Sequence, residues 1–211
     1  MTIHSIIKFI SLASAIFLLI GCKADSLEIK LSDEEIKAAI AGETVSIDFE
    51  AEFSMLGELD EENKATLDQL LILAEEFLVL EDFEIENGDF GAKILLEGSM
   101  PITANAQEES PWYIKVSPYG GSFYMVQLKT GGNFDRLESA MSDINFLLSA
   151  DPYHPLKYKY KGPGSSVIAP AVEIGGTTHL YYSEKIENRL TMNFSGGPFD
   201  NTGGGFLVSF D

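Results

Sequence analysis

Cysteine is almost absent from this sequence, because Cys22 is the only one among 211 residues. A single cysteine excludes an internal disulfide, so the folded part must be stabilised by its hydrophobic core. The composition allows this, since 45% of the residues are apolar and 11% are aromatic. That is enough for a real core in a chain of this length. The lone cysteine nevertheless needs an explanation of its own.

Positive charge is also scarce, with 14 Lys and Arg against 33 Asp and Glu and a formal net charge of -19. Phosphate contacts in nucleic-acid binding come largely from Lys and Arg, so we expect no nucleic-acid partner. The same charge disfavours docking of the body onto anionic lipid headgroups. The imbalance lies in residues 25–110, with 24 acidic and 4 basic residues, against 9 and 8 in residues 111–211. This acidic half either steers a basic partner or cations, or simply keeps the protein soluble.

A long hydrophobic run is missing as well. The apolar stretch at residues 9–20 follows a start whose only charged side chain is Lys8, and it is shorter than the roughly 20 apolar residues that span a bilayer. A charged start, a short apolar stretch and small residues before a cleavage site are typical of a secretory signal peptide. Residues 1–21 are therefore predicted to be such a peptide.

Four residues make this prediction more specific. Leu19, Ile20, Gly21 and Cys22 resemble the lipobox of bacterial lipoproteins. The resemblance implies cleavage before Cys22, a diacylglyceryl group on its sulfur and an amide-linked acyl chain on its new N-terminus. Two or more acyl chains suffice for stable anchoring. The family pattern also favours the outer membrane, facing the periplasm, over the inner membrane, because Lys23 rather than aspartate follows the cysteine.

The body after the signal peptide has the length of one domain. Residues 22–31 are expected to be a lipidated tether, and residues 32–211 a single α+β domain. Ser32 and Glu35 have the spacing of a helix capping box. Residues 45–53 alternate between apolar and polar side chains, which predicts a strand with one buried face. Amphipathic helices are expected where apolar residues recur at helical spacing, at residues 60–78 and 134–148.

Further strands are expected between turns rich in glycine and proline. Consecutive strands joined by tight turns are antiparallel, and amphipathic helices bury their apolar stripes against a sheet. The predicted fold is therefore α+β: a curved, mainly antiparallel sheet with two amphipathic helices on one face. The order strand, helix, strand, strand occurs twice, which suggests a diverged duplication with halves 32–110 and 111–211.

No catalytic or metal-binding motif is evident. His154 and His179 are the histidines after the signal peptide, and no pattern joins them to a carboxylate or serine. No pair of His or Cys residues has zinc-site spacing, and no acidic turn matches a calcium loop. The glycine clusters lack the residues of a phosphate loop, and neither Ser165 nor Ser195 lies in a nucleophile-elbow pattern. We predict no catalytic residue, metal or cofactor.

Two features remain as candidates for binding. Lys157, Lys159 and Lys161 lie on one face of a predicted strand and would serve an anion or partner site, protect a sheet edge, or pair with a carboxylate row such as Asp48, Glu50 and Glu52. Core packing is the default for the aromatic residues, but in an incompletely closed fold they would line a cavity for an apolar ligand. These aromatic residues are Trp112, Tyr181, Tyr182, Phe194, Phe199, Phe206 and Phe210.

The sequence therefore predicts a non-catalytic envelope lipoprotein that acts at the membrane surface as a protein-binding or accessory module. Its partners are expected to be the membrane, through the lipid anchor, and a protein of unknown identity. One alternative is a carrier or chaperone for a lipid or other hydrophobic ligand. Another is a hydrolase with an unrecognised site.

Overall fold

A computed structural model describes residues 25–56, 60–88, 91–145, 149–152, 155–196 and 203–210. Its three helices are α2 (Asp33–Ile40), α3 (Glu61–Phe77) and α4 (Phe134–Ile144). The strands are, in chain order, β1 (Ser26–Ser32), β2 (Val45–Leu56), β3 (Val79–Gly88), β4 (Gly91–Thr103), β5 (Trp112–Gly120), β6 (Phe123–Thr130), β7 (Leu156–Lys161), β8 (Ser166–Ile174), β9 (Thr177–Lys185), β10 (Arg189–Phe194) and β11 (Phe206–Ser209).

The strands close into a barrel. Nine of them follow one another in the order β10-β7-β1-β2-β4-β5-β6-β11-β8, and pairing of β8 with β10 closes the ring. β3 and β9 lie outside the ring and pair with β4 and β8. The prediction of an open curved sheet with two helices on one face is therefore wrong. Alternation and turn residues specify strands and their neighbours in sequence, whereas this closure depends on distant pairs such as the parallel β1 and β7.

A bend in β8 brings two edges of the sheet together. Ser166–Ile168 pair with β11, whereas Glu173 pairs with Asn193 of β10. Between these segments Ala171 has a φ of 47°, a left-handed conformation that costs a residue with a Cβ roughly 1–2 kcal/mol. The chain therefore tolerates local strain at the place where one strand changes partners.

The inward side chains of the barrel strands form the core. The fully buried ones include Ile29, Phe49, Ile114, Tyr158 and Phe206. Because side chains alternate along a strand, the charged residues between them point outward. α2 contacts β1, β2, β4 and β5 and buries Ile36 and Ala39. The predicted capping box is confirmed, since the backbone N–H of Ser32 donates to Glu35 Oε2 at 2.6 Å.

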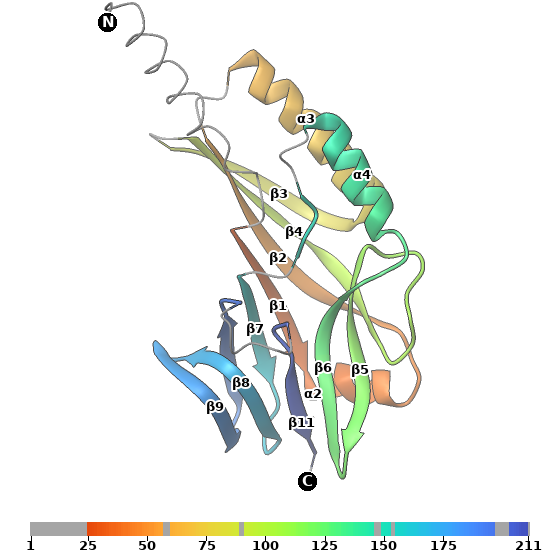
Figure 1. The fold of residues 1–211 in the computed structure, drawn as a ribbon, viewed down its shortest axis with the longest axis vertical. Helices are drawn as coiled ribbons and strands as arrows, with labels where there is room; N and C mark the ends of the chain where they lie inside the picture. The colour runs from red at the N-terminus through yellow and green to blue at the C-terminus, as the bar shows by residue number, and fades with distance from the viewer. Residues whose placement is uncertain are drawn as a thin grey trace, which may run out of the picture.

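The other two helices lie side by side along the far part of β2, β3 and β4, well away from α2 (Figure 1). α3 and α4 fall within the predicted helical segments, and β2 contains the strand predicted at residues 45–53. No helix in the described part of the chain is long and apolar enough to cross a membrane.

Two further expectations change at this level. Ser26–Leu31 were expected in a tether but form most of β1, because Leu27, Ile29 and Leu31 alternate into the core. The two proposed halves pair differently: β2, β4 and β3 are neighbours, whereas β6 pairs with neither β7 nor β8 among the described residues. The strand pairing therefore gives no support for a duplication.

Candidate ligand-binding cavity

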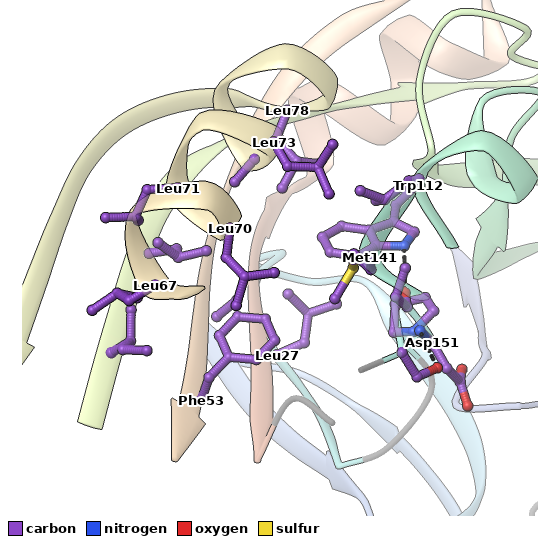
Figure 2. A pocket seen from close by; sticks show the side chains of 18 of the residues that line it. Leu27, Phe53, Leu67, Leu70, Leu71, Leu73, Leu78, Trp112, Met141 and Asp151 are labelled. Atoms are coloured by element: carbon purple, nitrogen blue, oxygen red, sulfur yellow. Dashed lines mark hydrogen bonds between the residues drawn. The ribbon is translucent and has the colours of Figure 1, made fainter. Parts of the chain in front are cut away.

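A cavity of about 90 Å³ lies between the two neighbouring helices and the inner face of the sheet. Figure 2 shows leucines of α3 facing Phe53 and Leu27 of the strands, with Met141 and Trp112 on the other side. The complete lining is Leu27, Ala51, Phe53, Ser54, Leu67, Leu70, Leu71, Leu73, Ala74, Leu78, Ile94, Leu96, Trp112, Leu137, Met141, Ser149, Ala150, Asp151 and Pro152.

The cavity exists because α3 and α4 do not close fully onto the sheet. Leu67 and Leu137 are each only 3% exposed and hold the helices in place. The other helix residues in the lining, such as Leu70, Ala74 and Met141, are only half-buried. These side chains therefore keep apolar surface that the sheet does not cover.

A cation and an aromatic ring join the two helices to each other. The guanidinium of Arg136 in α4 lies 5.1 Å from the centre of the Phe77 ring in α3. The same side chain approaches Glu76 Oε1 at 3.6 Å. This ion pair is largely exposed and stabilises little, so packing and the cation–π contact are the main links.

One border of the cavity is the short segment 149–152, which hydrogen bonds tie down on two sides. Trp112 Nε1 donates to the carbonyl of Ala150 at 3.0 Å, and the N–H of Ala150 donates to Glu138 Oε2 at 2.6 Å. The N–H of Asp151 donates to Ser149 Oγ at 3.2 Å. The indole N–H is thus satisfied, and Trp112 presents only its apolar ring to the cavity.

Chemically, this wall suits an apolar ligand. The lining contains no Lys, Arg or His among the residues that the structure describes. No group of three or more His, Cys, Asp or Glu in the same part of the chain is placed to hold a metal ion. Recognition here would rest on the hydrophobic effect and on shape, as in apolar binding pockets generally.

The aromatic residues proposed from the sequence separate into different places. Trp112 lines the cavity. Phe194 and Phe206 belong to the barrel core, with ring centres 6.0 and 5.3 Å from that of Tyr158. Tyr182 is buried, whereas Tyr181 is 64% exposed on β9. Phe210 packs under the ammonium of Lys37, and Phe199 lies outside the described residues.

The lysines of β7 do not form an open anion site. β7 lies between β1 and β10, so the suggestion of a sheet edge is wrong. Lys157 Nζ lies 2.7 Å from Glu28 Oε2, and Lys159 pairs with the other oxygen of the same carboxylate. The expected carboxylate row on β2 is therefore not their partner. Lys161 is exposed and lies opposite Ser32 and Arg189 in the sheet.

The environment of Glu28 has opposing effects on its acidity. Burial is the largest single influence and would raise the pKa of its carboxyl group, but the hydrogen bonds and positive charges of Lys157 and Lys159 together lower the pKa below its usual 4.5. Glu28 is therefore held ionised on the outer face of the barrel, where it neutralises two of the three candidate lysines.

Of the two candidate histidines and the cysteine, the structure describes only His179, whose ring contacts a tyrosine ring. His179 lies in β9 with its ring centre 5.5 Å from that of Tyr182. Ser165 Oγ donates to Asp33 Oδ2 at 2.9 Å, so in the described part of the chain this hydroxyl is bonded to a carboxylate. His154 and Cys22 lie outside the described residues, as do residues 1–21.

Sequence reasoning missed the aliphatic part of the cavity, since it assigned the apolar residues of α3 to core packing. One signal could have found it. Residues 70–74 are Leu, Leu, Ile, Leu and Ala in succession, which is broader than the stripe one sheet face can cover. Ile72 is 67% exposed on the far side of the helix.

Comparison of the chain with protein-family models and with curated proteins finds no match.

Proposed function

We propose that this chain is a non-catalytic, lipid-anchored protein of the cell envelope that binds a hydrophobic ligand in the cavity under α3 and α4. The observation that carries the proposal is the apolar lining itself, built from half-buried side chains of α3 and α4 and from side chains of β1, β2, β4 and β5. Half-buried apolar side chains facing one another leave unfavourable hydrated surface, and an apolar ligand would remove it.

The size of the cavity limits the ligand. About 90 Å³ is well below the roughly 300–1,000 Å³ of pockets that enclose a whole drug-sized molecule. A slim chain fits such a space segment by segment, whereas a fused ring system or a pair of chains would have to separate the helices. The ligand is therefore proposed to insert one hydrocarbon chain.

The position of the only tryptophan provides a direct assay. A bromine-tagged undecanol that enters the cavity would quench the fluorescence of Trp112, because heavy-atom quenching requires close contact. We expect saturable quenching in the wild-type protein. Ala74→Phe places a phenyl ring in the cavity from the half-buried face of α3. Because the ring occupies volume that the ligand needs, this variant is expected to bind about tenfold more weakly or worse.

Ala65→Phe is the matched control, because Ala65 is exposed on the same helix and does not line the cavity. It should leave the quenching curve unchanged. Equal quenching in both variants would show that the chain binds elsewhere, and absence of quenching in the wild type would reject the proposal.

The envelope location and the anchor rest on the lipobox resemblance around Cys22. Cys22→Ala should abolish incorporation of labelled palmitate and move the protein from the membrane fraction to the soluble fraction, since the acyl chains provide the anchoring free energy. Retention of Cys22→Ala in the outer-membrane fraction would contradict lipid anchoring.

A second candidate is the accessory role, in which the protein binds a partner. The edge strand β9 favours it, because β9 pairs with β8 alone in the described part of the chain and its Leu180 and Tyr181 are 69% and 64% exposed. Such an edge suits an extended partner segment that adds as a further strand. Cross-linked pull-down with wild-type protein and Leu180→Lys tests it, and equal recovery of every partner by both would argue against this surface.

A further inference from the structure

The charge around the cavity selects among hydrophobic ligands, provided that the cavity binds one as proposed above. Asp151 is the one charged residue in the described lining. It lies at the edge of the cavity, with its carboxylate pointing away from the leucines (Figure 2). Because Asp151 is only half-buried, the polar end of a bound chain would meet this carboxylate where solvent begins.

Hydrogen bonds hold the backbone beside Asp151. Its neighbour Ala150 is held at both backbone groups, by Trp112 on the barrel side and Glu138 on the helix side. Glu138 brings a second negative charge to the same border. A carboxylate on a fixed segment selects charge better than one on a mobile loop, because no rearrangement is needed on binding.

The two helices that cover the cavity, α3 and α4, also carry a net negative charge. α3 contains five acidic residues and one lysine, and α4 contains three acidic residues and one arginine. That arginine, Arg136, already approaches Glu76 and covers the Phe77 ring. An anionic headgroup would meet repulsion from this border, whereas a cationic headgroup would be attracted.

We infer that the occupant is a single-chain amphiphile whose polar end carries an ammonium group, with its chain against the leucines of α3 and its cationic end at Asp151. Fatty acids and anionic lipids are disfavoured ligands on this account. The hydrocarbon part supplies most of the affinity, and the charge supplies the discrimination among chains of equal length.

Three bromine-tagged undecyl probes of equal length test this, ending in trimethylammonium, hydroxyl and carboxylate. Titrations follow Trp112 quenching in the full chain, below micelle-forming concentrations and at low salt. We expect the ammonium probe to bind about tenfold more tightly than the carboxylate probe, with the alcohol between them, and the preference to shrink as salt rises. Asp151→Asn should reduce the preference severalfold, whereas Asp143→Asn, exposed on α4, should not.

The outcomes separate this inference from the proposed function. Quenching by none of the three probes would reject ligand binding altogether. Equal or tighter binding of the carboxylate probe would overturn the inference while leaving a hydrophobic-ligand protein. An unchanged preference in Asp151→Asn would overturn the role of Asp151. Weaker binding of the ammonium probe by Ala74→Phe shows that the probe reports on the cavity, and unchanged binding would show that it reports on the acidic surface instead.

Discussion

At the scale of single residues, the buried carboxylate of Asp33 accepts hydrogen bonds from two buried hydroxyl groups. The hydroxyl of Tyr160 donates to Asp33 Oδ1, and Ser165 Oγ donates to Oδ2 at 2.9 Å. A Cβ at Gly162 would lie 2.5 Å from Asp33 Oδ1, so only glycine allows this close approach. Asp33 begins α2, and its partners lie in β7 and beside β8. The network therefore ties the helix to the barrel wall.

Tyr160→Phe should destabilise the protein by about 1.5–3 kcal/mol, the usual cost of losing a hydrogen bond to a charged group. Urea unfolding measures this, and Tyr181→Phe is the control, because Tyr181 is exposed. If the two variants unfold at the same urea concentration, the network does not stabilise the fold.

The same residue gives a pH dependence. Burial and the hydrogen bond to Asp33 raise the pKa of Tyr160 well above its usual 10.0. Its contribution is fully present below pH 10 and is lost above that value, where the tyrosine ionises in the unfolded chain but not in the folded one. Wild-type stability should therefore fall more steeply than that of Tyr160→Phe above pH 10, and parallel curves would contradict this.

At the scale of elements, the parallel contact of β1 with β7 is held by charge on the outside and by apolar side chains within. Glu28 receives both Lys157 and Lys159, and it is only 8% exposed. Between β1 and β2, Lys30 pairs with Glu50 at 2.5 Å, but the Glu50 side chain is 28% exposed against 10% for that of Glu28. Only the first of these ion pairs is expected to stabilise the sheet substantially.

Glu28→Gln should cost about 1–2 kcal/mol, because two ammonium groups lose their partner, whereas Glu50→Gln should cost less than about 1 kcal/mol. Because the pKa of Glu28 is lowered from 4.5, its contribution is present above that pH and disappears as pH falls below it. Between pH 7 and pH 3, the melting temperature of Glu28→Gln should therefore fall less than that of the wild-type protein. Equal costs for both variants would contradict a special role for Glu28.

The sequence predicts elements of this fold better than it predicts their arrangement. The alternation in β2, the capping box at Ser32 and the apolar spacing in α3 and α4 arise from neighbouring residues, so local physics specifies them. The pairing of β7 with β1 joins residues more than a hundred positions apart, and no local pattern encodes it. For the same reason, local patterns predict a tether where β1 lies, and they predict a sheet edge, an anion or partner site, or pairing with the β2 carboxylates for the β7 lysines.

At the scale of the whole molecule, closure of the barrel and the incomplete cover by α3 and α4 act together. The closed ring buries a core that stabilises the fold without disulfides, which leaves the helices free to cover a cavity rather than complete the core. The sequence predicts the residues of both helices but not the gap, because a gap depends on how far two elements approach each other. We propose that the protein carrying this cavity is anchored to the membrane by lipid on Cys22.

The most direct test of the central claim is the anomalous scattering of bromine in crystals grown with the bromine-tagged undecyl trimethylammonium probe. A chain in the cavity predicts a single bromine peak among the leucines of α3, Met141 and the ring of Trp112. Crystals with the cavity side chains packed against one another and no bromine between them, or with bromine only at the outer surface, would contradict the account.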